Sequence, residues 1–202
     1  AANGPFSPYF KETIGYQTIE TSSNSKIAIE NLEQIGYNIL DNSGLRKNMN
    51  GNYLSFSLLI NKDNPSHVLA ANLIKAQLKE VGIKISVNPL NYNGYISALK
   101  SGSFQLYLAE VKINNNFDIS PLVTAGGSCA YGITEDSSAT GLTDIINKYK
   151  SGGASVSDVI TAVGSQMPFI PLCYRSGMIF YSQELSAVSN ASADDLFMFL
   201  QN

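Results

Sequence analysis

The chain has 202 residues, a formal net charge of −3 and an apolar fraction of 44%. This length suits one domain or two small ones, and the apolar content is enough to bury a core. Basic residues are few and scattered, which excludes an extended groove for phosphates, so we expect no nucleic acid partner. No apolar run approaches the length that crosses a bilayer, and AANGPFSPYF lacks the basic start and apolar core of a signal peptide, which leaves the compartment open.

Residues that usually carry catalytic chemistry are sparse. Cys129 and Cys173 are far apart without metal-ligand spacing, so we expect a buried free thiol at each, with a disulfide between them as the alternative. His67, the single histidine, falls in the first turn of a predicted amphipathic helix, which favours an exposed or capping role over a catalytic one. No serine lies in a nucleophile elbow, and no His, Asp or Glu cluster has metal spacing. The sequence therefore predicts neither an enzyme nor a metal or cofactor site.

The first fifty residues predict an arm, one helix and a connector. Residues 1–23 are rich in Gly, Pro, Ser and Thr, which is typical of an extended arm lying against another surface. Asn24 then matches a helix cap, and Gly36 suits the left-handed end of the helix. Its apolar positions at helical spacing are Ile27, Ala28, Leu32 and Ile35. Residues 41–52 are a polar, turn-forming connector.

The stretch from residue 52 to residue 108 predicts three strands separated by single helices. The strand over residues 54–60 becomes continuously apolar, as expected for a strand covered on both faces. Asn64 followed by Pro65 predicts the start of a helix that ends at Gly82. The other features are an apolar helix stripe of Ala71, Ile74, Leu78 and Val81, a strand over residues 83–87 that Pro89 ends, a short helix with Tyr95, Ile96 and Leu99, and a strand over residues 104–111.

This alternation predicts parallel strands with right-handed crossovers. Ligands of such sheets bind outside the carboxyl ends of the strands, and here that edge includes the asparagine-rich loops 61–64, 88–93 and 112–118. Four tyrosines also fall in or near loops, where they suit a ligand surface, with partly buried packing as the alternative. They are Tyr92, Tyr95, Tyr131 and Tyr174.

The last third predicts two helices and a strand-like segment. A loop over residues 124–141 precedes a helix around residues 142–149. Ser155 and Asp158 resemble a capping box at the start of a second helix. Residues 169–182 are strand-like, and residues 183–202 form a predicted tail whose apolar end needs a partner surface.

Five segments, in order, resemble the extracellular solute-binding proteins of ABC importers, specifically the oligopeptide/nickel-binding family, family 5. The strongest resemblance lies in AANLIKAQLKEVGIKISVNPLNYNGYISALKSGSFQLYLAEV, residues 70–111. The other segments are GPFSP (4–8), KIAIENLEQIGYN (26–38), LSFSLLIN (54–61) and MPFIPLCYRSGMIFYS (167–182). The resemblance covers nearly the whole chain.

The resemblance implies an α/β, periplasmic-binding-protein-like lobe of the class II type, with a mostly parallel βαβαβ sheet flanked by helices. It implies that residues 1–202 form a single lobe, with an α/β core at residues 24–182, from a longer two-lobed protein. The two lobes of such a protein close on the ligand like a hinged clamp. The implied partners are a peptide or small solute, the missing N-terminal lobe and an ABC permease. The implied protein is monomeric, extracellular or periplasmic, and anchored as a lipoprotein.

The ligand-contact segment of this family, commonly gW.aDypDP, corresponds to residues 110–118. The resemblance implies ligand contacts from Glu110, Val111, Lys112, Ile113, Asn114, Asn115 and Asp118. Val111 stands at the tryptophan position, and Asn114 or Asn115 stands where the acid of peptide binders pairs with the peptide amino terminus. An amide supplies no counter-charge for a buried ammonium group. Binding to the main chain of residues 110–113 by strand addition does not depend on these side chains.

Two alternatives come from other functional classes. One is an interaction or signalling module that reuses the lobe without transport. The other is an α/β enzyme that acts through His67 or Asp118.

Overall fold

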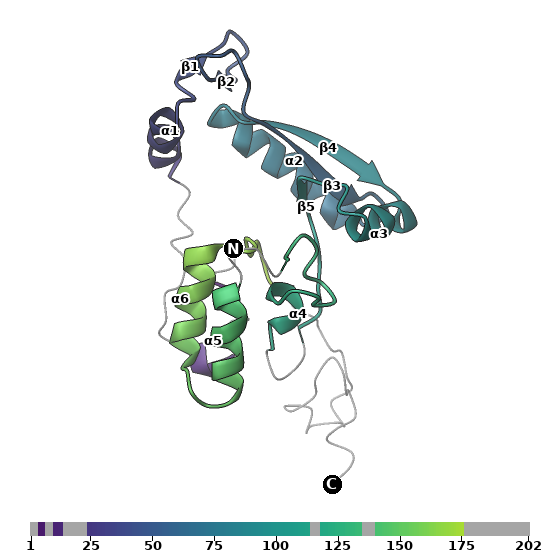
Figure 1. Ribbon diagram of the computed structural model, residues 1–202. Coiled ribbons are helices and arrows are strands. Elements are labelled where there is room, and N and C mark those ends of the chain that lie inside the picture. The colour runs from purple at the N-terminus through teal and green to yellow at the C-terminus, as the bar shows by residue number, and fades with distance from the viewer. Residues whose placement is uncertain (1–3, 7–9, 14–23, 114–117, 135–139, 176–202) are drawn as a thin grey trace, which may run out of the picture.

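The computed structural model describes residues 4–6, 10–13, 24–113, 118–134 and 140–175. Two groups of elements stand apart in Figure 1: a parallel sheet with helices α2 and α3, and a helical group formed by α4, α5 and α6. The predicted tail over residues 183–202 lies outside the described residues, as does most of the predicted arm over residues 1–23.

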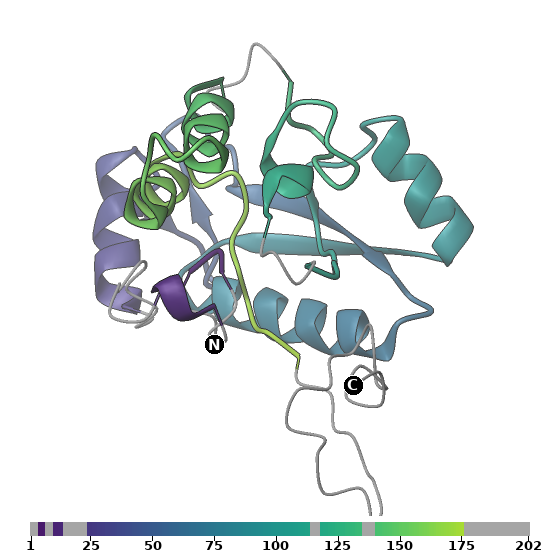
Figure 2. The same ribbon diagram turned by 90° about the horizontal axis from the view of Figure 1, so that it is seen from below.

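The sheet confirms the predicted alternation of strands and helices. Its elements are β3 (Ser55–Asn61), α2 (Pro65–Glu80), β4 (Lys84–Leu90), α3 (Tyr92–Lys100) and β5 (Leu106–Tyr107). The strand order is β4-β3-β5, and both neighbouring pairs are parallel. Figure 2 shows α2 lying along the strands.

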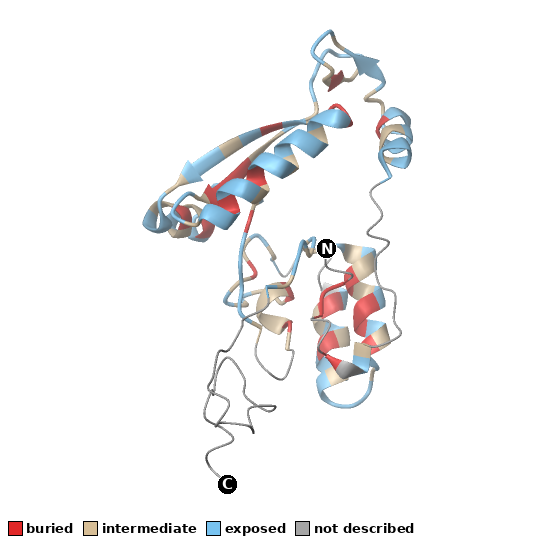
Figure 3. Ribbon diagram, turned by 180° about the vertical axis from the view of Figure 1, so that it is seen from behind, coloured by how far each residue is buried: buried red, intermediate tan, exposed pale blue. Residues whose placement is uncertain are grey.

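The central strand β3 is covered on both faces, as its continuous apolar run predicts. Leu58 and Ile60 pack with Ala71 of α2 in one buried cluster. Leu59, which points to the opposite face, packs with Tyr95 of α3 in another. The two helices therefore shield opposite faces of one strand, and Figure 3 shows buried residues where the sheet meets α2 as well as along α5 and α6.

Two predicted strand boundaries are wrong. Pro89 does not end β4, because β4 is an edge strand where the missing N–H of proline is tolerated, and Pro89 pairs with Ile60. The last strand is much shorter than residues 104–111. Its pairing with β3 ends where the Leu108 amide donates to the Leu59 carbonyl at 3.0 Å.

The predicted helix after Asn24 is α1 (Ser25–Gln34), and the Asn24 side chain accepts a hydrogen bond from the Ile27 amide at 3.1 Å. Its predicted apolar stripe is not buried as a whole: Leu32 is buried, whereas Ile27 and Ile35 are 51% and 67% exposed. A short antiparallel hairpin follows, formed by β1 (Ile39–Leu40) and β2 (Arg46–Lys47).

Arg46 connects this hairpin to the ends of two helices. Its side chain is buried, and Nε donates to the Val81 carbonyl at the end of α2 at 3.0 Å. One terminal nitrogen contacts Glu33 of α1 and the Tyr37 carbonyl, each at 3.1 Å. Its backbone amide also donates to the Gly82 carbonyl at 2.8 Å. A buried charge is tolerated here because Nε and one terminal nitrogen both have acceptors, and Glu33 supplies the opposite charge.

The helical group consists of α4 (Ser120–Val123), α5 (Thr140–Lys150) and α6 (Val156–Gln166). Phe6 and Phe10, which belong to the predicted arm, are buried against α5 and α6. A short 3₁₀ turn, η1 (Lys11–Thr13), follows them. The predicted capping box at the start of α6 is confirmed, with reciprocal hydrogen bonds between Ser155 and Asp158.

Two further predictions about the C-terminal third are wrong. Residues 169–175 form no strand, and residues 176–182 lie outside the described part of the chain. Cys129 and Cys173 are free, as expected, but neither is buried: Cys129 is half-buried and Cys173 is exposed. The disulfide alternative does not form.

Candidate functional site

The topology of the sheet indicates where to look for a functional site. The chain leaves β3 through α2 to reach β4, then returns through α3 past β3 to form β5 on the other side. The strand order therefore reverses at β3. In open α/β sheets, ligands bind at such a reversal, outside the carboxyl ends of the strands. The candidate site thus lies where the loop after β5 meets the first turn of α2.

Glu110 connects three segments at this edge. Its Oε2 accepts a hydrogen bond from Asn64 Nδ2 at 3.1 Å, and its Oε1 pairs with the Arg175 guanidinium at 2.6 Å. Asn64 also caps α2, because its Oδ1 accepts from the Ser66 amide at 3.0 Å. The hydrogen bond from Asn64, and then that from Arg175, lower the pKa of Glu110 below its ordinary value, so its carboxylate is charged at neutral pH.

His67 lies in the first turn of α2, but the prediction that it is exposed or capping is wrong. The side chain is 7% exposed, and its ring meets the Tyr95 ring edge-on at a centroid distance of 6.3 Å. Neither ring nitrogen has a hydrogen-bond partner among the described residues. Burial lowers the pKa of His67 despite the opposing effect of the Glu110 charge, so the ring is neutral at neutral pH.

The segment after β5 is anchored at its start and open beyond it. The Tyr95 hydroxyl donates to the Leu108 carbonyl at 2.9 Å, and burial raises the pKa of Tyr95 to about 12. Within the described part of the chain, the backbones of Ala109, Val111 and Ile113 make no hydrogen bond to other backbone groups. Ala109 and Val111 are exposed, and Ile113 is half-buried. This backbone is available to an added strand.

The four loop tyrosines suit either a ligand surface or partly buried packing, and the structure separates them. Tyr95 is buried, Tyr131 packs edge-on against Tyr107, and the Tyr174 hydroxyl donates to the Gly4 carbonyl at 2.7 Å, so packing accounts for three of the four. Tyr92 is 58% exposed at the start of α3, which leaves it as the one of the four that packing does not account for.

Asp118 contacts the helical group. Its Oδ2 pairs with Lys150 Nζ of α5 at 2.9 Å, and its Oδ1 accepts from the Ser120 amide at 2.9 Å and from the Ser120 hydroxyl. Burial acts to raise the pKa of Asp118, but the hydrogen bonds from Lys150 and Ser120 outweigh it and the pKa is lowered. These contacts give Asp118 a turn-forming role.

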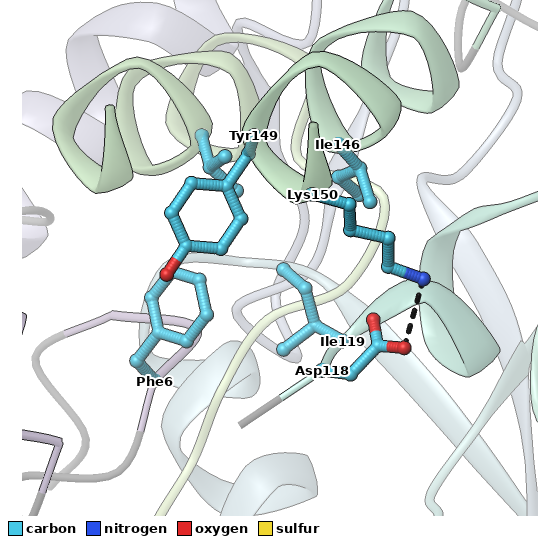
Figure 4. A pocket seen from close by; sticks show the side chains of 7 residues that line it. Phe6, Asp118, Ile119, Ile146, Tyr149 and Lys150 are labelled. Carbon is cyan, nitrogen blue, oxygen red and sulfur yellow. Dashed lines mark ion pairs between the residues drawn. The ribbon is translucent and has the colours of Figure 1, made fainter. Parts of the chain in front are cut away.

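Asp118 and Lys150 also border a cavity of about 340 Å³. Figure 4 shows their ion pair on one side, and Phe6 and Tyr149 on the other. Its remaining lining residues are Ile119, Ile146 and Val159. Because these three belong to the buried cluster of the helical group, the cavity is mainly a packing space within that group.

The structure thus brings Glu110 to the sheet edge, where it contacts Asn64, and Val111, Lys112 and Ile113 follow it in the same loop, whereas Asp118 contacts α4 and α5. The predicted contacts Asn114 and Asn115 lie outside the described residues. Sequence reasoning missed Arg175 and treated Asn64 only as a cap. Asn64 could have been found, because loop 61–64 lies at the predicted ligand edge. Arg175 could not, because no local pattern indicates a contact with a residue 65 positions away.

Among the described residues, no helix is long and apolar enough to cross a membrane. Across those same ranges, no group of three or more His, Cys, Asp and Glu side chains is arranged to hold a metal ion.

Solved structures of low sequence identity share this fold. The oligopeptide-binding protein AppA from Bacillus subtilis, in complex with a nonapeptide, has a TM-score of 0.65 at 18% identity over 83% of this chain and 35% of its own. A periplasmic oligopeptide-binding protein from Thermotoga maritima, bound to mannohexaose, has a TM-score of 0.60 at 20% identity over 85% of this chain and 35% of its own. A nickel ABC transporter structure from Bacillus halodurans has a TM-score of 0.59 at 18% identity over 83% of this chain and 35% of its own.

These similarities show a periplasmic-binding-protein-like fold, and the chain covers about a third of the length of each of the three structures. A comparison with curated proteins finds no match. The model of the family "Bacterial extracellular solute-binding proteins, family 5 Middle" matches residues 1–131, which is more than half of the chain. The chain therefore belongs to the family 5 bacterial extracellular solute-binding proteins.

Proposed function

We propose that residues 1–202 form one lobe of a two-lobed substrate-binding protein of an ABC importer, which binds an oligopeptide or a similar small solute and delivers it to a membrane permease. Family membership supports a binding role without catalysis. The Bacillus subtilis relative binds a nonapeptide and the Thermotoga maritima relative binds mannohexaose, so related folds accept extended oligomers. The coverage of about a third of each relative suits a single lobe.

The open backbone after β5 is the observation that carries this proposal. Ala109, Val111 and Ile113 follow directly from a strand of the sheet, yet their backbones have no ladder partner in the described part of the chain. An extended ligand that lies beside them can pair with this backbone as an added strand does. The Tyr95–Leu108 hydrogen bond fixes the start of the segment, which lowers the entropy lost when a ligand binds.

The ligand contacts that we propose are Glu110, Val111, Lys112 and Ile113, together with Asn114 and Asn115, which lie outside the described residues. Asp118 contributes to this site indirectly, because its carboxylate holds the turn at Ser120 and already pairs with Lys150. We further propose an extracellular or periplasmic location with lipid anchoring in a longer, monomeric protein.

A nuclear magnetic resonance titration of the 202-residue chain with trialanine tests this function. We expect weak, saturable shifts of the backbone amides of Ala109, Val111 and Ile113, because half of the ligand cleft belongs to the other lobe. Trialanine with methylated peptide nitrogens is the matched control, since it cannot donate backbone hydrogen bonds. The absence of any shift at these amides with several oligopeptides would refute peptide binding.

A further inference from the structure

Helix α2 is apolar on two opposite faces. One face, which includes Ala71, packs on the sheet. The other carries Leu69, Leu73 and Ala76, which share one side of the helix because they are spaced by four and three residues. Leu69 and Leu73 are 64% and 54% exposed, and Ala76 is exposed as well. We call these three residues the outer stripe. A helix that is apolar on all sides belongs in an interior, so the outer stripe indicates a partner that covers it.

Two lysines border the outer stripe on one flank. Lys75 and Lys79 are exposed, and they lie side by side because they are four residues apart. In the described part of the chain, neither lysine forms an ion pair. The outer face of α2 therefore suits a partner that combines an apolar run with neighbouring acids.

The described chain ends beside the first turn of α2. The Arg175 guanidinium pairs with Glu110 at 2.6 Å, and Glu110 accepts a hydrogen bond from Asn64, which caps α2. Leu69 follows Asn64 by five residues, which is about 8 Å along the helix axis. Residues 176–202 therefore continue the chain from a point close to the start of the outer stripe.

The sequence of this C-terminal segment complements the outer face of α2. Residues 194–200 read DDLFMFL, two acids followed by five apolar residues. Twenty residues separate Arg175 from Leu196, and an extended chain of that length spans up to about 66 Å. Helix α2 is about 24 Å long, so the whole outer stripe is within reach.

We propose that residues 196–200 dock on the outer stripe of α2, with Asp194 and Asp195 beside Lys75 and Lys79. Because the segment is tethered, its effective concentration is in the millimolar range, and a weak contact is enough to hold it. Three side chains of one helix offer far less than the roughly 800 Å² per partner of a stable dimer, which favours the tethered segment over a second copy. This inference is independent of the proposed function, because the outer stripe contains none of the proposed ligand contacts.

Nuclear Overhauser contacts in the full 202-residue chain test this docking directly. We expect contacts from the methyl groups of Leu69 and Leu73 to the rings of Phe197 and Phe199. In a mixture of ¹³C-labelled and unlabelled chains, these contacts should be absent between copies. Contacts between copies would make a second chain the occupant and overturn the proposal. A spectrum in which neither leucine contacts any of residues 194–200 would overturn it too.

Leu69→Gln tests the apolar part of the contact. The amide shifts of residues 196–200 report the docked fraction, because undocking is a local event that leaves the sheet folded. The loss of one leucine side chain from the contact should lower the ratio of docked to undocked segment about tenfold. The matched control is Ile35→Gln at the end of α1, where the side chain is 67% exposed, and it should leave these shifts unchanged. Identical shifts in wild type and Leu69→Gln would refute docking on the outer stripe.

The double variant Lys75→Gln and Lys79→Gln tests the charged part. It should lower the docked ratio about threefold at low salt, since exposed ion pairs contribute little each. In about 1 M sodium chloride, where such pairs are screened, the double variant should match the wild-type chain. Lys100→Gln at the end of α3 is the control and should have no effect. An equal loss in Lys100→Gln would show that net charge alone drives the change and would overturn the placement of Asp194 and Asp195 beside α2.

Discussion

The sheet and the helical group bury their apolar residues in different ways. In the sheet, Leu58 and Leu59 of β3 pack against α2 and α3, the two helices that follow β3 in the chain. In the helical group, the buried cluster joins Phe6 and Phe10 to Val163 across most of the sequence. Local pattern therefore suffices to specify the sheet, whereas the helical group depends on contacts that no local pattern indicates.

Leu59→Ala is expected to lower the stability most, because Leu59 lies at the centre of the core between β3 and α3. Leu59 is 1% exposed, and its truncation leaves a cavity between β3 and α3, which should cost about 4 kcal/mol of unfolding free energy. Urea denaturation followed by circular dichroism measures the loss. Leu73→Ala on the outer face of α2, where the side chain is 54% exposed, should change the stability by less than about 0.5 kcal/mol. Equal losses in the two variants would contradict the burial described for β3.

Phe6→Ala tests the long-range core and should cost about 3 kcal/mol. The cost is lower than for Leu59 because Phe6 borders the cavity beside Tyr149, where neighbouring side chains have room to shift. Amide hydrogen exchange should accelerate in α5 and α6 and stay unchanged in α2 and β3. Faster exchange throughout the sheet would show instead that the two regions unfold together.

The sequence predicted the sheet well because each signal there is local. The run Leu58 to Ile60 indicates a strand covered on both faces, and Asn64 followed by Pro65 starts a helix whatever lies nearby. The failures depend on distant neighbours. Pro89 sits within a strand because β4 is at an edge, and His67 is buried by Tyr95 from another helix. The Glu110–Arg175 ion pair at the candidate site connects residues that are too far apart in the chain for a local pattern to relate them.

Gly82→Ala tests the long-range contact of Arg46 with the end of α2. Gly82 has a φ of +91°, and an added Cβ would collide with Cγ of Arg46, whose buried side chain contacts Val81 and Glu33. We expect a loss of about 2 kcal/mol, of which the left-handed backbone alone accounts for about 1. Gly36→Ala is the matched control, because its φ is +94° and a Cβ there meets nothing within 4 Å. The stability lost by Gly82→Ala, measured by thermal unfolding, should exceed that lost by Gly36→Ala by the cost of the collision with Arg46. Identical losses would show that the Arg46 side chain moves away freely.

Asp158→Asn should have the smallest effect. It tests whether the capping box of α6, which is recognisable from local sequence, stabilises a helix of the helical group. The Ser155 hydroxyl and amide donate to the Asp158 carboxylate at 2.7 and 2.8 Å, and the hydroxyl first and then the amide lower the pKa of Asp158 from its ordinary 3.8. A carboxyl group whose pKa falls on folding stabilises the folded state above the unfolded pKa, and this contribution is lost as the pH falls through the folded pKa. The stability advantage of the wild-type chain over Asp158→Asn should therefore be constant from pH 7 to about 5 and should shrink below about 4. Urea midpoints measured across this range report the difference in stability between the two chains. In a Ser155→Ala background this difference should depend less on pH, because the hydrogen bond that lowers the pKa of Asp158 most is gone. A difference that stays flat down to pH 2 would show that the capping box is local in sequence but does not stabilise α6 through its charge.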